Sequence, residues 1–182
     1  MTRIFLSIAV AALMTIAANG GADMFALTSP TLIDGKVVPE QHVYNGMGYH
    51  GKNLSPELSW TGAPAGTRSF ALTVFDPDAP RVGGWWHWLV FDIPSSVTHL
   101  PEGAGSGHGM PQDVIQSITD FGPPGYGGPA PPPGKTHRYI FTIYALKTVK
   151  LGLSSETAPT AVEAAIKQAS LGQATIIGLY GK

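Results

Sequence analysis

The feature of the sequence that most constrains the fold is segment 69–75, Ser-Phe-Ala-Leu-Thr-Val-Phe, which is apolar at nearly every position. A strand with one face in water alternates apolar and polar side chains, whereas a strand inside a fold does not. The segment therefore predicts a strand that is covered on both faces. Residues 76–80, Asp-Pro-Asp-Ala-Pro, end it, because proline cannot donate to a central hydrogen-bond ladder.

Three further strands are predicted. A turn at Gly83 and Gly84 leads into a strand over residues 85–93, which is closed by Pro-Ser-Ser. Residues 137–146 are rich in β-branched and aromatic side chains, which favour a strand. Residues 174–180 predict the last one. These elements indicate a mostly β chain with antiparallel strands in two packed sheets.

One helix is predicted between the last two strands, and we expect it to cover a sheet. Thr160 and Glu163 can form a capping box, with Pro159 just outside the helix. Gly172 supplies a stop signal at the C-terminal end. The apolar face of the helix consists of Val162, Ala165, Ile166 and Ala169.

Composition narrows the class of protein. The 23 glycines and 16 prolines follow no fixed period, so they indicate turns and fixed loops. Segment 103–134 concentrates them, and a loop of this length in a compact domain favours a functional role. A net charge of −1 gives no electrostatic reason to expect a nucleic acid as partner.

The N-terminal segment predicts export. Arg3 precedes an apolar run over residues 4–18, which then gives way to Asn-Gly-Gly. This run has the length of a signal-peptide core and is short for a membrane span, although an uncleaved anchor is the alternative. We therefore expect residues 1–22 to be a signal peptide and 23–182 to be one domain. Together with the absence of cysteine, this favours a periplasmic or secreted protein without a transmembrane span in its mature form.

The cleavage site gives a first testable prediction. Gly20 and Ala22 provide the small residues that signal peptidases require, so the mature chain is expected to start at or near Asp23. Intact-mass spectrometry of the exported protein measures this directly. A mature mass that includes residues 1–22 would contradict it.

Two carboxylates follow the first strand. Asp76 and Asp78 lie two residues apart, so both point to one side if the chain there is extended. Pro77 and Pro80 fix the backbone around them. The alternative is an Asp-Pro turn in which each carboxylate caps a backbone N–H.

The predicted strand over residues 85–93 carries a histidine near its start. Period-two alternation places Trp85, His87 and Leu89 on one strand face, with Trp86, Trp88 and Val90 on the other. An imidazole among indoles favours either a ligand site or a core histidine bonded to a carbonyl.

The third strand offers a second imidazole. His137 and Tyr139 share a face, while Arg138 points the other way and is expected to make a structural salt bridge. The two histidines and the tyrosine can together donate hydrogen bonds to an anion.

Other chemistries find little support. The segment Gly-Ala-Gly-Ser-Gly at 103–107 lacks the spacing of a nucleophile elbow, and no phosphate-binding loop ending in Lys-Ser or Lys-Thr occurs. Two aspartates and two histidines could bind a divalent metal, but no close histidine spacing supports this. No catalytic residue, metal site or cofactor is therefore predicted.

Three segments, in order, carry a resemblance. They are 53–60 (Asn-Leu-Ser-Pro-Glu-Leu-Ser-Trp) leading into 66–72, then 76–80 before 84–88 (Gly-Trp-Trp-His-Trp), and finally 125–132 before 137–141. Through them the chain resembles the phosphatidylethanolamine-binding proteins, in particular the bacterial branch related to Raf kinase inhibitor proteins. The resemblance implies a Greek-key-like fold of antiparallel sheets with a C-terminal helix. It also implies a cis peptide bond near Ala79-Pro80.

The resemblance further implies a shallow anion-binding cavity at one end of the fold. The residues it assigns to this cavity are Asp76, Asp78, Trp85, His87, Gly128, Ala130, Pro131, His137 and Tyr139. The expected function is non-catalytic binding of a small anion or phosphate ester of the phospholipid-headgroup type, with a role as inhibitor or modulator of a protein partner. A hydrolase that uses Asp and His on a phosphate or acyl ester is the alternative, and lipid transfer is a third.

The charge of the cavity sets an expectation for pH. Carboxylates repel a phosphate unless the histidines are protonated or the ligand carries a cation as well. With His87 and His137 as charged donors, binding is expected to weaken as pH rises.

Overall fold

The computed structural model describes residues 24–181, and the predicted signal peptide lies outside them. Short strands and one short 3-10 helix (labelled η) precede the long elements: β1 (Ala26–Thr28), η1 (Glu40–His42), β2 (Asn45–Gly46), β3 (Tyr49–His50) and β4 (Leu58–Thr61). The middle of the chain contains β5 (Ser69–Asp76), β6 (Trp85–Pro94), β7 (His99–Leu100), η2 (Ala104–Ser106), β8 (Ile115–Gln116), β9 (Ile118–Thr119) and β10 (Gly122–Pro124). The last elements are β11 (His137–Leu146), α1 (Pro159–Ala169) and β12 (Ser170–Tyr180).

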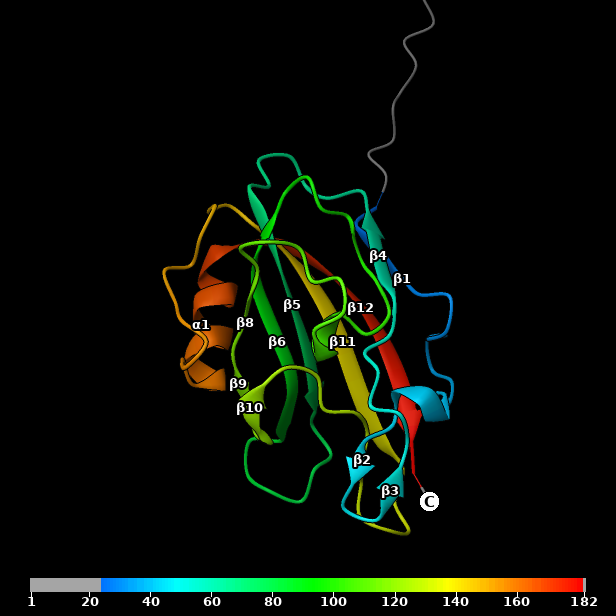
Figure 1. Ribbon diagram of the computed structural model, residues 1–182. Helices are drawn as coiled ribbons and strands as arrows, with labels where there is room; N and C mark the ends of the chain where they lie inside the picture. Colours follow the sequence, from blue (N-terminus) through cyan, green and yellow to red (C-terminus); the bar gives the residue numbers. More distant parts are fainter. Residues whose placement is uncertain (1–23, 182) are drawn as a thin grey trace, which may run out of the picture.

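The scaffold is a five-stranded sheet in the order β12-β11-β5-β6-β8, against which a three-stranded sheet, β1-β4-β7, packs (Figure 1). Strand pairings within the sheets are antiparallel, as predicted, and β5 is buried along most of its length. An isolated parallel bridge joins Val37 to Leu179 at the edge of β12. The chain is thus mostly β with one helix near its C-terminus. Among the described residues, no helix is long and apolar enough to cross a membrane.

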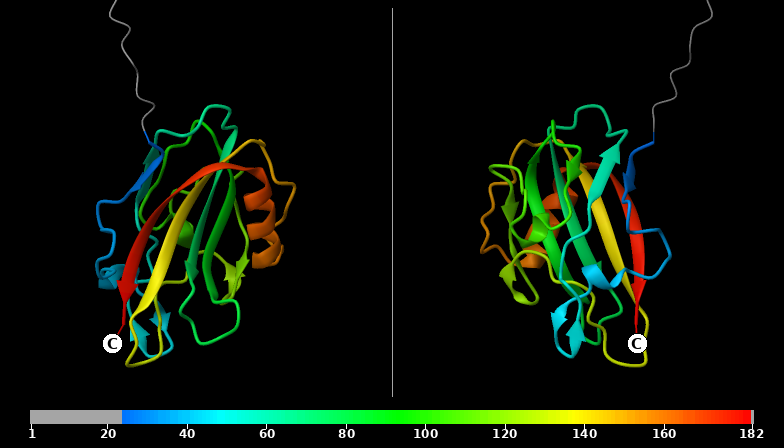
Figure 2. Two further views of the ribbon diagram at one scale, coloured as in Figure 1. Left: turned by 180° about the vertical axis from the view of Figure 1, so that it is seen from behind. Right: turned by 45° about the vertical axis from the view of Figure 1, so that its right-hand side comes forward.

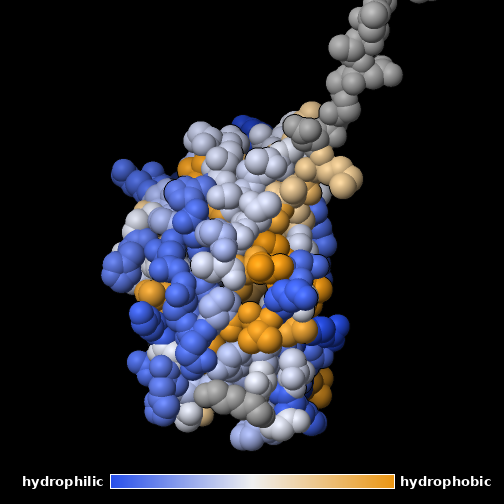
Figure 3. Space-filling model, turned by 90° about the vertical axis from the view of Figure 1, so that its right-hand side faces the viewer, coloured by the Kyte–Doolittle hydropathy of each residue, from blue (hydrophilic) through white to orange (hydrophobic). Residues whose placement is uncertain are grey.

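Two apolar clusters lie on the two faces of the large sheet. The first, between the sheets, includes Trp60, Trp88 and Phe141, each at most 1% exposed. The second lies under α1, which covers the opposite face (Figure 2), and its helical members are Val162, Ile166 and Ala169. Apolar surface also remains at the outer edge (Figure 3), where the segment bearing exposed Ile33 and Val37 runs along β12.

The ends of α1 differ from the prediction. Pro159 is the first helical residue, after Ala158 as N-cap, and no side chain caps the helix. A proline fits this position because its missing N–H would have no partner there. Thr160 therefore lies inside the helix, so the capping box was wrong. The helix ends at Ala169, and the chain becomes extended at Ser170 instead of stopping at a glycine.

The turn between β5 and β6 also corrects an expectation. The described residues contain no cis peptide bond, so Ala79-Pro80 is trans. The chain reverses instead through Gly83 and Gly84, with φ values of 89° and 69°, a region that glycine adopts without strain. The Arg81 amide hydrogen-bonds to the Ala79 carbonyl and tightens the turn.

The predicted alternation along β6 breaks at His87. Phe75 pairs with Trp86, but the next residue back, Val74, pairs with Trp88, so His87 is one extra residue on β6. Such a bulge reverses the facing of the residues that follow it, as far as the second register shift of this strand pair, between Val90 and Ile93. Trp86 accordingly packs under the helix, whereas Trp88 lies in the cluster between the sheets, so these two do not share a face.

Candidate functional site

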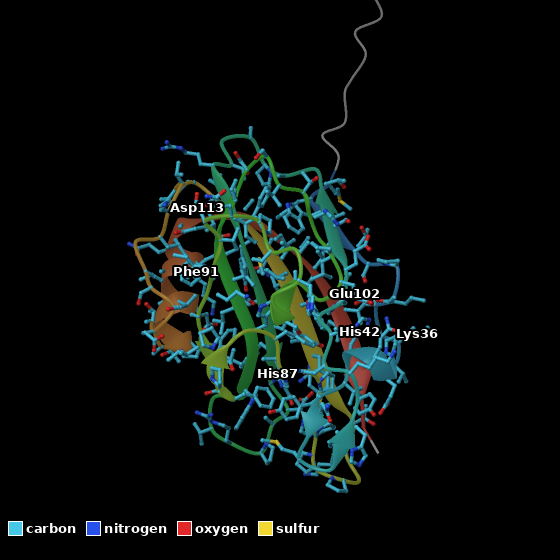
Figure 4. The ribbon with its side chains drawn as sticks, in the orientation of Figure 1. Lys36, His42, His87, Phe91, Glu102 and Asp113 are labelled. Carbon is cyan, nitrogen blue, oxygen red and sulfur yellow. The ribbon has the colours of Figure 1, made fainter. Side chains whose placement is uncertain are left out.

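Strand order brings the chemically distinctive residues to one edge of the large sheet. Because β5 is antiparallel to both of its neighbours, β11 and β6, its end lies beside the starts of those two strands. Asp76 closes β5, Trp85 opens β6, and His137 opens β11. Figure 4 shows His87 at this lower end of the fold, with Phe91 further along the same strand.

A cavity of about 140 Å³ opens at this edge. The residues that line it are Met47, Asp76, Ala79, Pro80, Trp85, His87, Phe121, Ala130, Pro131, Pro132, His137 and Tyr139. Pockets for drug-sized ligands measure roughly 300–1,000 Å³. The cavity therefore has room for a small group rather than for a whole lipid.

Asp76 and His137 form a buried pair in the floor of the cavity. Nδ1 of His137 lies 2.8 Å from Oδ2 of Asp76, and the two side chains are only 2% and 4% exposed. The other carboxylate oxygen of Asp76 accepts a hydrogen bond from the Asp78 amide at 2.8 Å. The carboxylate thus fixes the imidazole ring and leaves Nε2 of His137 for a ligand.

His87 is held by the backbone of the loop that follows β10. Its Nδ1 lies 2.7 Å from the carbonyl oxygen of Gly127. The ring is perpendicular to Tyr139 at 5.1 Å and meets Phe121 edge-on at 5.2 Å. Burial lowers the pKa of His87 to about 4, so at neutral pH the ring is neutral and is not the charged donor expected from the sequence.

Tyr139 places a buried hydroxyl in the same cavity. The side chain is 0% exposed, and its hydroxyl proton has no acceptor among residues 24–181. Burial and the Asp76 charge raise the pKa of this hydroxyl, while the Ala130 amide beside it acts in the opposite direction. Nε1 of Trp85 is likewise buried without a described partner. Both groups are hydrogen-bond donors.

Asp78 lies outside this cavity. Its carboxylate binds Arg138 through two hydrogen bonds of 2.8 and 2.7 Å and also accepts from the Arg138 amide. The bonds to Arg138 lower the pKa of Asp78 to about 2. Arg138 was expected to make a structural salt bridge, and it does so with Asp78 on the outer face of β11.

Gly128 supports the cavity rim without lining it. Its amide donates to Oδ1 of Asn53 at 2.7 Å, and Nδ2 of Asn53 donates to the Tyr126 carbonyl at 3.0 Å. A Cβ atom on Gly128 would lie 2.1 Å from the His42 carbonyl oxygen, so only glycine fits there. This loop carries Ala130 and Pro131 to the rim.

Seven of the nine residues assigned from the sequence therefore line the cavity, and Asp78 and Gly128 do not. Five lining residues were not assigned: Met47, Ala79, Pro80, Phe121 and Pro132. Phe121 is the most consequential of these, because it meets both Trp85 and His87 edge-on. Its aromatic ring within a glycine- and proline-rich segment was the available signal.

Hydrogen bonds made by Asp120 stabilise the wall of the cavity. Asp120 accepts from the Trp86 amide at 2.7 Å and from Arg81 at 2.9 Å, which joins the β5–β6 turn to the segment that carries Phe121. Arg81 also lies over the Trp85 ring, 5.3 Å from its centre. Residues 24–181 hold no group of three or more side chains suited to a metal ion.

Sequence and structure comparisons agree on the relationships of the chain. UPF0098 protein YbhB of Escherichia coli K12 is 47% identical over 155 residues, which is 85% of this chain and 98% of YbhB. The crystal structure of E. coli YbcL, described as a new member of the mammalian PEBP family, is 42% identical, with a TM-score of 0.85, and the match covers 87% of this chain and 98% of YbcL. The PEBP homologue CT736 of Chlamydia trachomatis is 30% identical over 87% of this chain and 97% of its own, with a TM-score of 0.73. The phosphatidylethanolamine-binding protein family model matches residues 28–181, and the chain belongs to this family.

Proposed function

We propose that the cavity binds a small phosphate-type group, such as a phosphate ester of headgroup size, without turning it over. We also propose that the protein does so outside the cytoplasm, after loss of residues 1–22, where the occupied cavity can modulate a protein partner. The observation that carries the first proposal is a pair of buried donors whose protons have no acceptor among residues 24–181, the Tyr139 hydroxyl and Trp85 Nε1.

Buried donors without acceptors point to a ligand that accepts hydrogen bonds. Buried polar groups in folded proteins are nearly always paired, because an unmade bond costs about 1–3 kcal/mol. Five buried side-chain atoms lack a partner among residues 24–181, and two of them, on Trp85 and Tyr139, belong to residues that line one cavity. A tetrahedral oxyanion offers several acceptor oxygens within a group small enough for about 140 Å³.

Replacing Tyr139 by phenylalanine is expected to weaken phosphate binding while leaving the fold intact. The change removes one oxygen whose proton has no acceptor among residues 24–181, so the free energy of unfolding should stay the same or rise slightly. A lost hydrogen bond of about 1 kcal/mol should weaken binding about fivefold. Calorimetric titration with phosphoethanolamine measures the affinity.

Tyr144→Phe is the matched control for this experiment. Tyr144 lies on the same strand but packs under the helix, on the opposite face of the sheet. It should therefore leave affinity unchanged. Equal effects of the two substitutions, or binding untouched by Tyr139→Phe, would contradict the proposal.

A hydrolase is the second candidate, and one observation favours it. The Asp76–His137 pair orients an imidazole toward the cavity in the way that a general base is oriented. However, no serine, threonine or cysteine is among the described residues that line the cavity. Release of phosphate from phosphoethanolamine by the wild type, lost in Asp76→Asn, would favour the hydrolase over the binding protein.

A further inference from the structure

The tautomer of His87 determines what this residue can offer a ligand. A carbonyl oxygen only accepts, so the 2.7 Å contact with Gly127 requires the proton on Nδ1. In a neutral imidazole, Nε2 then has no proton and acts as an acceptor. His87 therefore presents the cavity with a lone pair instead of an N–H.

The surroundings keep the ring in this neutral form. His87 is 3% exposed, and desolvation is the largest influence on its pKa. The charges of Asp76 and Asp120 and the carbonyls of the 127–128 loop act in the opposite direction but do not outweigh burial. The remaining titratable neighbours in the cavity are His137 and Tyr139, both on β11.

The rest of the cavity reinforces this polarity. Two of its buried donors have no acceptor among residues 24–181, the Tyr139 hydroxyl and Trp85 Nε1, whereas His137 donates its Nδ1 proton to Asp76. The cavity also contains two acceptors, the unprotonated Nε2 of His87 and the Asp76 carboxylate. No lysine or arginine is among the described lining residues. A fully ionised oxyanion has only acceptor oxygens, so its lone pairs would face the lone pair on Nε2 of His87. The oxyanion would also lie near the negative charge of the Asp76 carboxylate.

Resting on the proposed function, we propose that the cavity selects oxyanions that retain a dissociable proton, and that Nε2 of His87 accepts the hydrogen bond of that proton. Inorganic phosphate and singly ionised phosphomonoesters meet this requirement. Sulfate has the same shape but no proton at neutral pH, and a phosphodiester also has none. The specificity therefore favours a monoester over the diester of an intact phospholipid headgroup.

The size of the discrimination follows from general experience with buried polar groups. A site built to receive a hydrogen bond rejects an analogue that cannot supply it, because the acceptor is left buried and unpaired. We expect phosphate to bind at least about tenfold more tightly than sulfate, the factor that corresponds to about 1.4 kcal/mol. The second ionisation of a phosphomonoester lies near pH 6, so methyl phosphate should bind progressively more weakly from pH 5.5 to 8.

The test is calorimetric titration of the wild-type protein at pH 6 and constant ionic strength with phosphate, sulfate, methyl phosphate and dimethyl phosphate. The affinity for phosphate should exceed the affinity for sulfate, and the affinity for methyl phosphate should exceed the affinity for dimethyl phosphate. Equal affinity within either pair overturns this inference but leaves the proposed function standing, with a lipid diester as the source if dimethyl phosphate binds as well as methyl phosphate. Binding of none of the four overturns the proposed function itself.

Two further measurements assign the selectivity to His87. In His87→Gln the side-chain amide can turn an N–H toward sulfate, so the preference for phosphate should largely disappear; a preference that persists excludes His87 as its source. Because this variant could fold poorly, an independent check uses the wild-type protein. Nitrogen-15 NMR of its histidine rings reports which ring nitrogen of His87 carries the proton. A proton on Nε2 of His87 in the free protein at pH 7 would overturn the inference.

Discussion

Replacing Asp76 by alanine is expected to lower the free energy of unfolding by about 3–5 kcal/mol, because it removes one member of a buried ionisable pair. The ring of His137 is 2% exposed and would lose the acceptor of its Nδ1 proton. The Asp78 amide would lose its acceptor as well. Urea denaturation at pH 7 measures the loss, and methyl phosphate titration should show that binding is lost with it.

Asp78→Ala is the matched control, two residues away in the same turn. Its partner Arg138 has a side chain that is 52% exposed, and Asp78 itself is 28% exposed. Exposed ion pairs contribute only about 0–1 kcal/mol. We therefore expect a small loss of stability and unchanged binding. Similar losses for the two aspartates would show that the buried pair has no special role.

Gly128→Ala is expected to destabilise the fold by about 3 kcal/mol, although alanine is only one methyl group larger. The new Cβ atom would lie 2.1 Å from the His42 carbonyl oxygen and 2.6 Å from the Tyr44 amide nitrogen. Both are backbone atoms, so one segment must move as a whole. The melting temperature should fall by about 6–12 °C for a domain of this size, and binding should weaken because the loop carries Ala130.

Gly134→Ala separates this clash from the ordinary cost of replacing a glycine. Gly134 has a φ of 83°, and a Cβ atom added there would meet no other atom within 4 Å, so only the backbone conformation resists the change. That resistance costs about 1–2 kcal/mol. If Gly128→Ala cost no more than Gly134→Ala, the close approach of the two backbone segments would not be required for stability.

The long strands were predictable because their sequences are unambiguous. The apolar run of β5 and the aromatic and β-branched run of β11 leave few alternatives, and both strands start where predicted. Strands of two residues, such as β2 and β3, have no periodicity to detect. Their position depends on long-range packing, for example that of Tyr49 against Tyr180.

The site residues were predictable where side chains alternate regularly along a strand. They were not predictable where the tertiary structure determines which way a side chain faces. His137 and Tyr139 share a cavity because β11 alternates regularly. The bulge at His87 is set by pairing with β5, so the facing of Trp88 could not be deduced from local sequence. Asp78 was assigned to the cavity through the resemblance, whereas the structure pairs its carboxylate with Arg138. Met47 comes from a hairpin without any sequence signal that linked it to the cavity.

The hydrogen bonds that close the cavity have a consequence for folding kinetics. Asp76 and His137 are 61 residues apart in the chain, and Asn53 and the Gly128 amide are 75 apart. Contacts between such distant segments form only after the entropy of closing large loops has been overcome, which makes them late events. The β5–β6 hairpin can pair locally, but a complete cavity requires chain that is synthesised well after it. Competence to bind a ligand should therefore appear with the last cooperative step of folding, and a ligand present during refolding would stabilise the finished state without accelerating the first strand pairings.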